Sequence, residues 1–189
     1  MTTVRWLDCP EAGVDARSRP TGLSTSALLN RLAAPGVPAG GVAVAWMVAA
    51  AAGLTAMVAR GHLEAEACRA DGWRGRALAL MDADPGAYQG VLAAGQGPER
   101  RQALEAAARV PAEVARLAAD CAELAARLAA DTEGPMAADA WVAVLAASAA
   151  ARGAAALVAE NLGSDAALAQ QAGRDAERAA VAAGPWAVP

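Results

Sequence analysis

The sequence predicts an all-α protein, folded as a single-domain helical bundle with two buried, alanine-rich central helices. Hydrophobic residues make up 56% of the 189 positions, whereas aromatic residues make up 3% and phenylalanine is absent. Alanine dominates the chain, and alanine is the best helix former and lets helices pack closely. The β-branched and aromatic runs that are typical of strands are scarce. A chain of this length suits one domain with a full core.

The N-terminal part is expected to differ from the rest. Residues 1–23 combine prolines and glycines with mixed charges and are predicted to form an irregular arm. The helical domain is therefore assigned to residues 24–189. A first short helix is predicted over residues 26–33, with Ser24 or Thr25 as its N-cap.

Gly40 and Gly41 are expected to end the loop before the first central helix, which should run from about Val42 into residues 64–67 unless Gly61 interrupts it. Glycines there allow a close approach of ligand or backbone, and the first N–H groups of a helix are free to bind an anion. The uncharged run over residues 40–59 has about the length of a membrane span. Alanine and glycine supply little insertion energy, so we interpret it as a buried bundle helix.

The remaining helices are expected over residues 74–94, 98–110, 112–130, 137–162 and 165–183. Proline removes one helical hydrogen bond and clashes with the preceding turn, so Pro85 should break or kink its helix and Pro111 should cause a kink or restart near Val110. The helix over residues 137–162 is nearly apolar and is predicted to be the second central helix.

Composition excludes several function classes. The net charge is −4 and the sequence pI is about 5.0, and no basic stripe is visible, which argues against nucleic-acid binding. The three cysteines are odd in number and far apart, which fits a reducing cytoplasm, and Cys68 and Cys121 are most simply small core residues. With one histidine and no metal-ligand spacing, a zinc site is not expected. No signal peptide is recognised at the start of the chain.

Short motifs follow one another along the chain. Residues 37–42 read Val-Pro-Ala-Gly-Gly-Val before an alanine-rich helix that reaches Met-Val, and residues 84–88 read Asp-Pro-Gly-Ala-Tyr before Val-Leu-Ala-Ala. Val-Pro at residues 110–111 comes next, then Ala-Asp at residues 138–139 before Val-Ala-Val-Leu. The last is Arg-Gly-Ala-Ala, starting at Arg152 and leading to Asn161.

In the order and spacing of these motifs, residues 24–183 resemble the formiminotetrahydrofolate cyclodeaminase and methenyltetrahydrofolate cyclohydrolase family. The resemblance implies an all-α bundle that forms a homodimer, with a folate site in a cleft at or near the dimer interface. It also implies chemistry that opens or closes a C–N bond of a one-carbon folate, without a metal. A tetrahydrofolate derivative would then be the small-molecule substrate, with no bound cofactor. We expect a cytoplasmic protein that binds neither nucleic acid nor a membrane.

The chain departs from the family pattern at charged and polar positions. Members carry Lys-Lys-Tyr after the Met-Val helix, where residues 65–68 here read Ala-Glu-Ala-Cys. Other departures are Val42 for Ser, Glu133 for Asn, Ala138 for Ser and Leu157 for Asn. Folates carry a tail of glutamate carboxylates, and exchanging lysines for a glutamate should weaken binding of such a tail. The departures point either to another substrate or to lost folate chemistry.

Asp84, Asp139 and His62 are the candidate catalytic residues. Each aspartate matches an acidic family position, and a carboxylate in an apolar cleft can move protons during C–N bond chemistry. The alternative is structural, with Asp84 capping a turn before Pro85 and Asp139 in the first turn of its helix. His62, the one imidazole, could act as a general base near pH 7 or be a helix-end residue.

Gly40, Gly41, Tyr88, Arg152 and Asn161 are the candidate substrate-binding residues. The glycines could cradle a ligand or permit a tight turn, and Tyr88 could stack on a heterocycle or pack in the core. Arg152, inside an apolar helix, requires an acidic partner and is either a structural ion pair or a substrate clamp. Asn161 could bind a ligand amide or end its helix.

Two functions follow from this sequence. The first is an enzyme, a C–N lyase or cyclic-amidine hydrolase, that uses carboxylate acid/base catalysis on a folate one-carbon derivative or on a repurposed substrate of specialised metabolism. The alternative is a non-catalytic, dimeric binding or assembly protein that kept the fold and lost the folate site.

Overall fold

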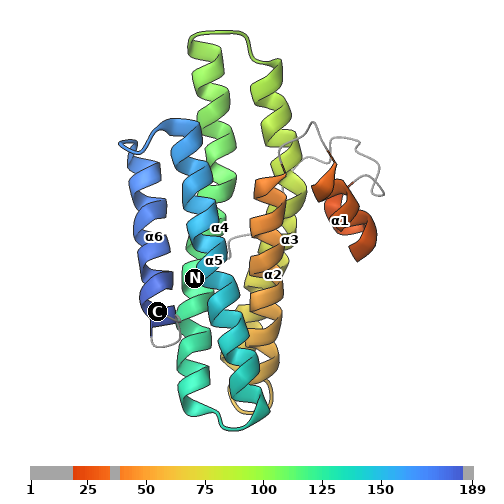
Figure 1. The fold of residues 1–189 in the computed structure, drawn as a ribbon, viewed down its shortest axis with the longest axis vertical. Helices are drawn as coiled ribbons and strands as arrows, with labels where there is room; N and C mark the ends of the chain where they lie inside the picture. Colours follow the sequence, from red (N-terminus) through yellow and green to blue (C-terminus); the bar gives the residue numbers. More distant parts are fainter. Residues whose placement is uncertain (1–18, 35–38, 185–189) are drawn as a thin grey trace, which may run out of the picture.

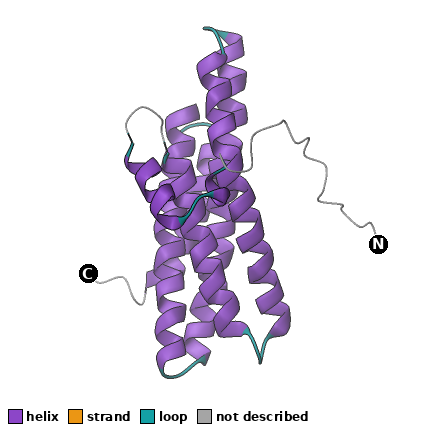
Figure 2. Cartoon of the chain, turned by 90° about the vertical axis from the view of Figure 1, so that its right-hand side faces the viewer, coloured by secondary structure: helices purple, strands orange, loops and turns teal. Residues whose placement is uncertain are grey.

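The computed structural model describes residues 19–34 and 39–184, and within these ranges it contains six α-helices, one short 3-10 helix and no strand. Their bounds are η2 Pro20–Gly22, α1 Thr25–Ala33, α2 Gly40–Ala59, α3 Glu64–Ala93, α4 Pro98–Asp131, α5 Pro135–Leu162 and α6 Ala167–Ala183. This confirms the all-α prediction. Helices α2 to α6 alternate in direction and form one elongated bundle, while α1 lies outside it beside α3 (Figure 1). The α3–α4 hairpin extends beyond the other helices at one end (Figure 2).

Most of the predicted irregular arm lies outside the described residues. Its last part forms η2, which Asp82 of α3 holds in place. The backbone N–H of Thr21 donates to this carboxylate at 2.9 Å and the Thr21 hydroxyl donates at 2.5 Å. Ser24 caps α1, as one of the two predicted caps, by accepting a hydrogen bond from the N–H of Ala27. Leu28 is the buried residue of α1.

The two central helices are α2 and α5, as predicted. Twelve of the 20 residues of α2 are buried, and they are nearly all alanine and valine. Both helices are long and apolar enough to cross a membrane by length and composition, with mean hydropathies of 2.0 and 1.8 in their most apolar windows. In the bundle, 61% and 44% of those windows are buried against other helices. The same composition therefore serves to build the core of the bundle.

The interruption considered at Gly61 is present, whereas the breaks considered at two prolines are not. The first central helix begins at Gly40 and ends at Ala59, because Gly61 adopts a φ of 95° and donates its N–H to Glu64, which starts the next helix. Pro85 and Pro111 do not break a helix, since α3 and α4 continue through them. Each proline removes one N–H donor, and the hydrogen bonds and packing on either side hold the remaining turns.

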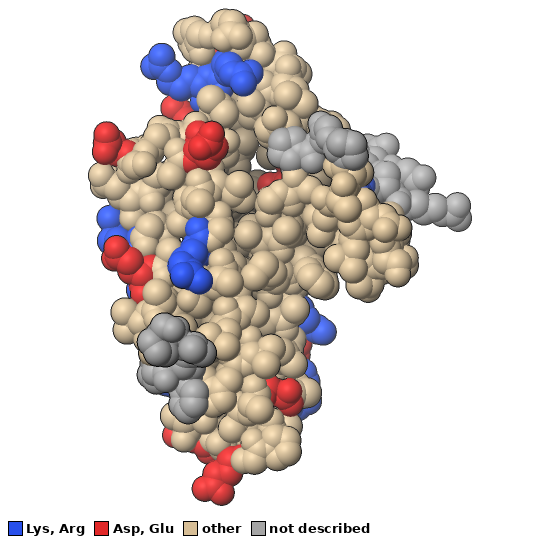
Figure 3. Space-filling view, in the orientation of Figure 1, with Lys and Arg blue, Asp and Glu red and all other residues tan. Residues whose placement is uncertain are grey.

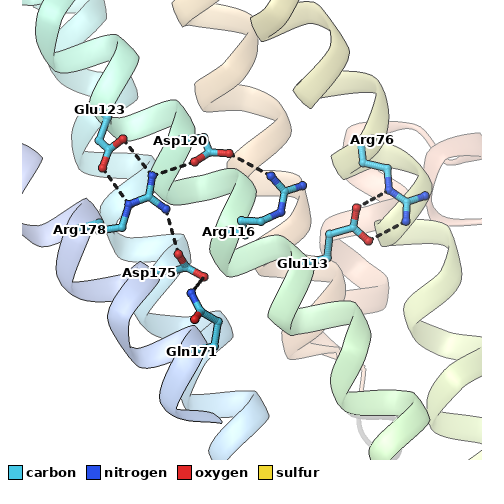
Figure 4. Close-up of polar contacts among 8 residues, drawn as sticks. All are labelled: Arg76, Glu113, Arg116, Asp120, Glu123, Gln171, Asp175 and Arg178. Atoms are coloured by element: carbon cyan, nitrogen blue, oxygen red, sulfur yellow. Dashed lines mark hydrogen bonds and ion pairs between the residues drawn. The ribbon is translucent and has the colours of Figure 1, made fainter. Parts of the chain in front are cut away.

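Charged side chains connect α4 to its neighbours on both sides (Figure 4). Arg178 of α6 donates to Glu123, Asp120 and Asp175, each at 2.9 Å. The pKa of the Arg178 guanidinium is raised by its hydrogen bonds with Glu123 and Asp120. On the other side of α4, Arg76 of α3 donates two hydrogen bonds to the carboxylate of Glu113, at 2.6 and 2.7 Å. These pairs add polar contacts between α4 and its neighbours α3 and α6 to the packing of the shared apolar core.

Candidate active site

A pocket of about 240 Å³ lies where the start of α2 meets α3, α4 and the last turns of α5. Its lining residues are Gly40, Gly41, Asp84, Ala87, Tyr88, Ala107, Pro111, Leu157, Glu160 and Asn161. In the space-filling view a hollow opens at this end of the bundle, and the charged atoms visible within it are acidic (Figure 3). The pocket thus combines an apolar wall with a few polar groups from α3 and α5.

Asp84 lies directly against the N-terminus of α2. A Cβ at Gly41 would overlap the Asp84 carboxylate, so any other residue there would force this carboxylate to move. The backbone N–H of Val42 donates a hydrogen bond to this carboxylate. The helix N-terminus that the sequence marks as an anion site is therefore occupied by the protein's own aspartate.

Burial raises the pKa of Asp84 above its ordinary value, and the hydrogen bond from Val42 opposes this rise only in part. A carboxyl group shifted in this direction keeps its proton to a higher pH, which suits it to exchange protons with a ligand near neutrality. No arginine, lysine or histidine belongs to the described pocket lining, so no cation holds Asp84 in its ionised form.

The other polar groups come from the next turn of α3 and from the end of α5. Tyr88 follows Asp84 by four residues, which places both on one face of α3. Glu160 is exposed at the rim, and Asn161 beside it is half-buried. Leu157, one turn earlier, would contact a side chain at Gly40 at 3.3 Å and therefore closes the apolar side of the pocket.

Five of the eight predicted site residues meet in this pocket: Gly40, Gly41, Asp84, Tyr88 and Asn161. Asp139 and His62 do not. Asp139 is near the start of α5, about 33 Å along the helix from Asn161 at 1.5 Å per residue. His62 is exposed in the turn after α2, about 30 Å from the start of that helix. One chain therefore cannot bring either residue to Asp84.

Two further predictions fail because the side chains face solvent. Arg152 was expected in the core with an acidic partner; it is exposed on α5, and no ion pair joins it to another described residue. Cys68 is also exposed, whereas Cys121 is fully buried, as predicted, and burial raises the pKa of its thiol to about 11.

Glu160 is the pocket residue that the sequence analysis missed. It is an acidic residue in the last turns of α5, where the helix dipole disfavours negative charge. An unfavourably placed carboxylate in an otherwise apolar helix is a signal that could have identified it. Its position beside Asn161 strengthens that signal.

A larger and more open groove of about 680 Å³ lies between α4 and α6. Its lining includes Arg178 and Glu123, which bind each other, and Arg174, which donates to Gln171. Because three of the five charged groups that line this open groove already have partners within the fold, the smaller pocket around Asp84 is the better candidate for chemistry.

Comparison with known proteins agrees with this architecture. The sequence model of the formiminotransferase-cyclodeaminase family matches residues 24–178. The crystal structure of formiminotetrahydrofolate cyclodeaminase from Thermotoga maritima is similar, with a TM-score of 0.72 and 22% sequence identity over 86% of this chain and 96% of that chain. At this identity the structural likeness shows the fold alone. No curated protein matches the chain significantly.

Proposed function

Because the chain belongs to the formiminotransferase-cyclodeaminase family, we propose that it is an enzyme that makes or breaks a C–N bond in a small heterocycle. The observation that supports this most strongly is the position of Asp84. Asp84 is half-buried in a pocket, and its carboxyl group has no cationic partner among the described residues and has a raised pKa. Those are properties of a group that transfers protons.

The proposed chemistry needs one proton to move between two nitrogens. In ring closure with loss of ammonia, a second amine nitrogen of the substrate attacks the formimino carbon, and the bond from that carbon to the former imino nitrogen breaks. Asp84 would take the proton from the attacking nitrogen and return it to the departing nitrogen. Tyr88 and Asn161 would orient the ligand through their hydroxyl and amide groups. Hydrolysis of a cyclic amidine would use the same carboxylate to activate water.

The test is turnover of 5,10-methenyltetrahydrofolate and 5-formiminotetrahydrofolate, followed by absorbance. Asp84→Asn keeps the shape of the side chain and removes proton transfer, and we expect it to lower kcat by about a hundredfold or more. Asp139→Asn is the matched control, since that residue lies outside the pocket. Equal turnover in wild type and Asp84→Asn would contradict the proposal.

A second copy of the chain is the proposed partner. The surface over α5 and α2 is mostly uncharged (Figure 3). Large apolar side chains stand exposed there: Trp46 at 37% and Met57 at 40% on α2, and Val142 at 54% and Leu145 at 44% on α5. Burying this surface against a second copy would remove it from water.

Light scattering after size-exclusion chromatography tests the homodimer. Val142→Glu should give a monomer, because it places a charge in the proposed interface. Leu92→Glu, at a residue that is 62% exposed near the end of α3, is the matched control and should leave the mass unchanged. A wild-type monomer at micromolar concentration would refute this partner.

The non-catalytic alternative rests on the missing Lys, Ser and Asn positions of the family, for example Leu157 and Glu133 in place of Asn. Convergence of Asp84, Tyr88, Glu160 and Asn161 on one pocket favours the enzyme instead. We further propose that the enzyme works in the cytoplasm on a free small molecule, without nucleic acid, membrane, metal or bound cofactor.

A further inference from the structure

We infer that the ligand of the pocket around Asp84 is a small organic cation, a protonated amidine or amine on a planar ring, that lacks the carboxylate tail of a folate. This inference rests on the proposed function and names its substrate class. It is carried by three features of the pocket: its charge, its size and the helix ends that meet in it.

The charged groups of the pocket are all acidic. Asp84 and Glu160 line it from α3 and α5, and none of its other described lining residues carries a charge. The chain contains no lysine at all; its 16 basic residues are arginines. A ligand carboxylate entering this pocket would meet two protein carboxylates, whereas a ligand cation would meet its counter-ions.

The pocket also suits a small ligand. Its volume of about 240 Å³ lies below the range of roughly 300 to 1,000 Å³ that is usual for sites of drug-sized molecules. Leu157 closes one side against Gly40, and Ala87, Ala107 and Pro111 supply further apolar surface. A planar ring fits such walls, with Tyr88 available for stacking.

The two helix ends at the pocket favour a cation as well. The N-terminus of α2 carries a partial positive charge, but Asp84 already occupies it through the N–H of Val42. The last turn of α5, with Glu160 and Asn161, presents the negative end of its dipole. Neither end is therefore left to attract an anionic ligand.

Isothermal titration with three probes of nearly equal shape tests the inference: benzamidinium, which is cationic, benzamide, which is neutral, and benzoate, which is anionic. We expect the wild type to bind benzamidinium at least about tenfold more tightly than either of the others, and added NaCl to weaken this preference. Asp84→Asn and Glu160→Gln should each reduce the preference several-fold. Glu105→Gln, an exposed acid on α4 outside the pocket, is the matched control and should keep it.

Equal binding of the three probes, tighter binding of benzoate, or no binding of benzamidinium would overturn the inference. An unchanged preference for benzamidinium in Glu160→Gln would also overturn the inference. Because Glu160 lies at the rim, this variant avoids any folding defect of Asp84→Asn. Turnover of the tail-bearing folates, measured in parallel, separates the two proposals. Folate turnover that depends on Asp84, without a preference for the cationic probe, would support the proposed enzymatic function and refute the cationic substrate class. A cation preference without folate turnover would support the substrate class.

Discussion

Two groups of carboxylates in this molecule differ in whether a cation of the protein pairs with them. Between α4 and α6, Asp120, Glu123 and Asp175 surround one guanidinium, that of Arg178, which donates to all three (Figure 4). Asp84 of α3 and Glu160 of α5 line one pocket, with no cation among its described lining residues. The first group is compensated within the fold, whereas we propose that a ligand cation compensates the second.

The pKa directions express the same contrast. Beside Arg76, the pKa of Glu113 is held below its ordinary value by the hydrogen bonds from the guanidinium. The pKa of Asp84 is raised, because burial outweighs the one hydrogen bond from Val42. Paired carboxylates therefore stabilise the folded chain in their ionised form, and the pocket carboxylate opposes folding when it is ionised.

Gly41→Ala should have the largest effect, because the added Cβ would displace the Asp84 carboxylate. We expect turnover to fall by about a hundredfold or more, equivalent to about 2.7 kcal/mol in the barrier. Gly53→Ala is the matched control on the same helix. Its Cβ would lie at an ordinary 3.7 Å from Arg74, so it should raise stability through helix propensity and leave kcat unchanged. Wild-type activity in Gly41→Ala would remove Asp84 from the mechanism.

Arg178→Gln should have the next largest effect, since it removes the cation from Glu123 and Asp175 and leaves Asp120 with Arg116 alone. The Asp175 side chain is 4% exposed, so its charge has little access to water. We expect a loss of about 2 kcal/mol in the free energy of unfolding, less than for a fully buried pair because Arg178 is 40% exposed. Urea denaturation measures this loss, with exposed Arg174→Gln as the control. Equal midpoints for the two variants would mean that the network adds nothing to stability.

The pH dependence of stability should distinguish the two groups by sign. At pH 7 Asp84→Asn should be more stable than wild type, because it removes the cost of an ionised buried carboxylate. This gain should disappear as the pH falls below the ordinary range of aspartate near 3.9. Glu113→Gln should be less stable than wild type at pH 7, by up to about 1 kcal/mol, and this loss should disappear as Glu113 becomes protonated in acid. Urea midpoints of both variants and of the wild type between pH 7 and pH 3 test these two expectations. A loss of stability in both variants at pH 7 would contradict the opposite signs expected for Asp84 and Glu113.

The smallest effect is expected at the exposed edge of the network. Arg116 binds Asp120 at 3.0 Å one turn along α4, with a side chain that is 51% exposed. Arg116→Gln should therefore cost no more than about 0.5 kcal/mol in thermal or urea unfolding. A loss as large as that of Arg178→Gln would show that Asp120 depends on both arginines.

The sequence is informative where structure follows from local pattern. Alanine content and the lack of strand formers specify an all-α chain, and Pro98 marks the start of α4 as predicted. Glycines ahead of an apolar run identify the start of α2. The motif at Asp84 identifies the α3 residue that lies against this helix start in the pocket. These features depend on neighbouring residues, and the propensity of each residue to form a helix, cap or turn is visible in one dimension.

Only the tertiary structure decides which of the polar candidates meet. Helices of 20 to 34 residues separate their two ends by about 30 to 50 Å, so position along a helix determines whether a residue can reach the pocket. Asn161 at the end of α5 lines the pocket with Asp84, and Asp139 at the start of the same helix does not. The same packing carries α3 through Pro85 and brings Glu160 to the rim. The sequence by itself thus determined the helices and most of the candidate site residues. The assembled bundle decided which of these residues lie together, because contacts between helices depend on where each turn reverses the chain.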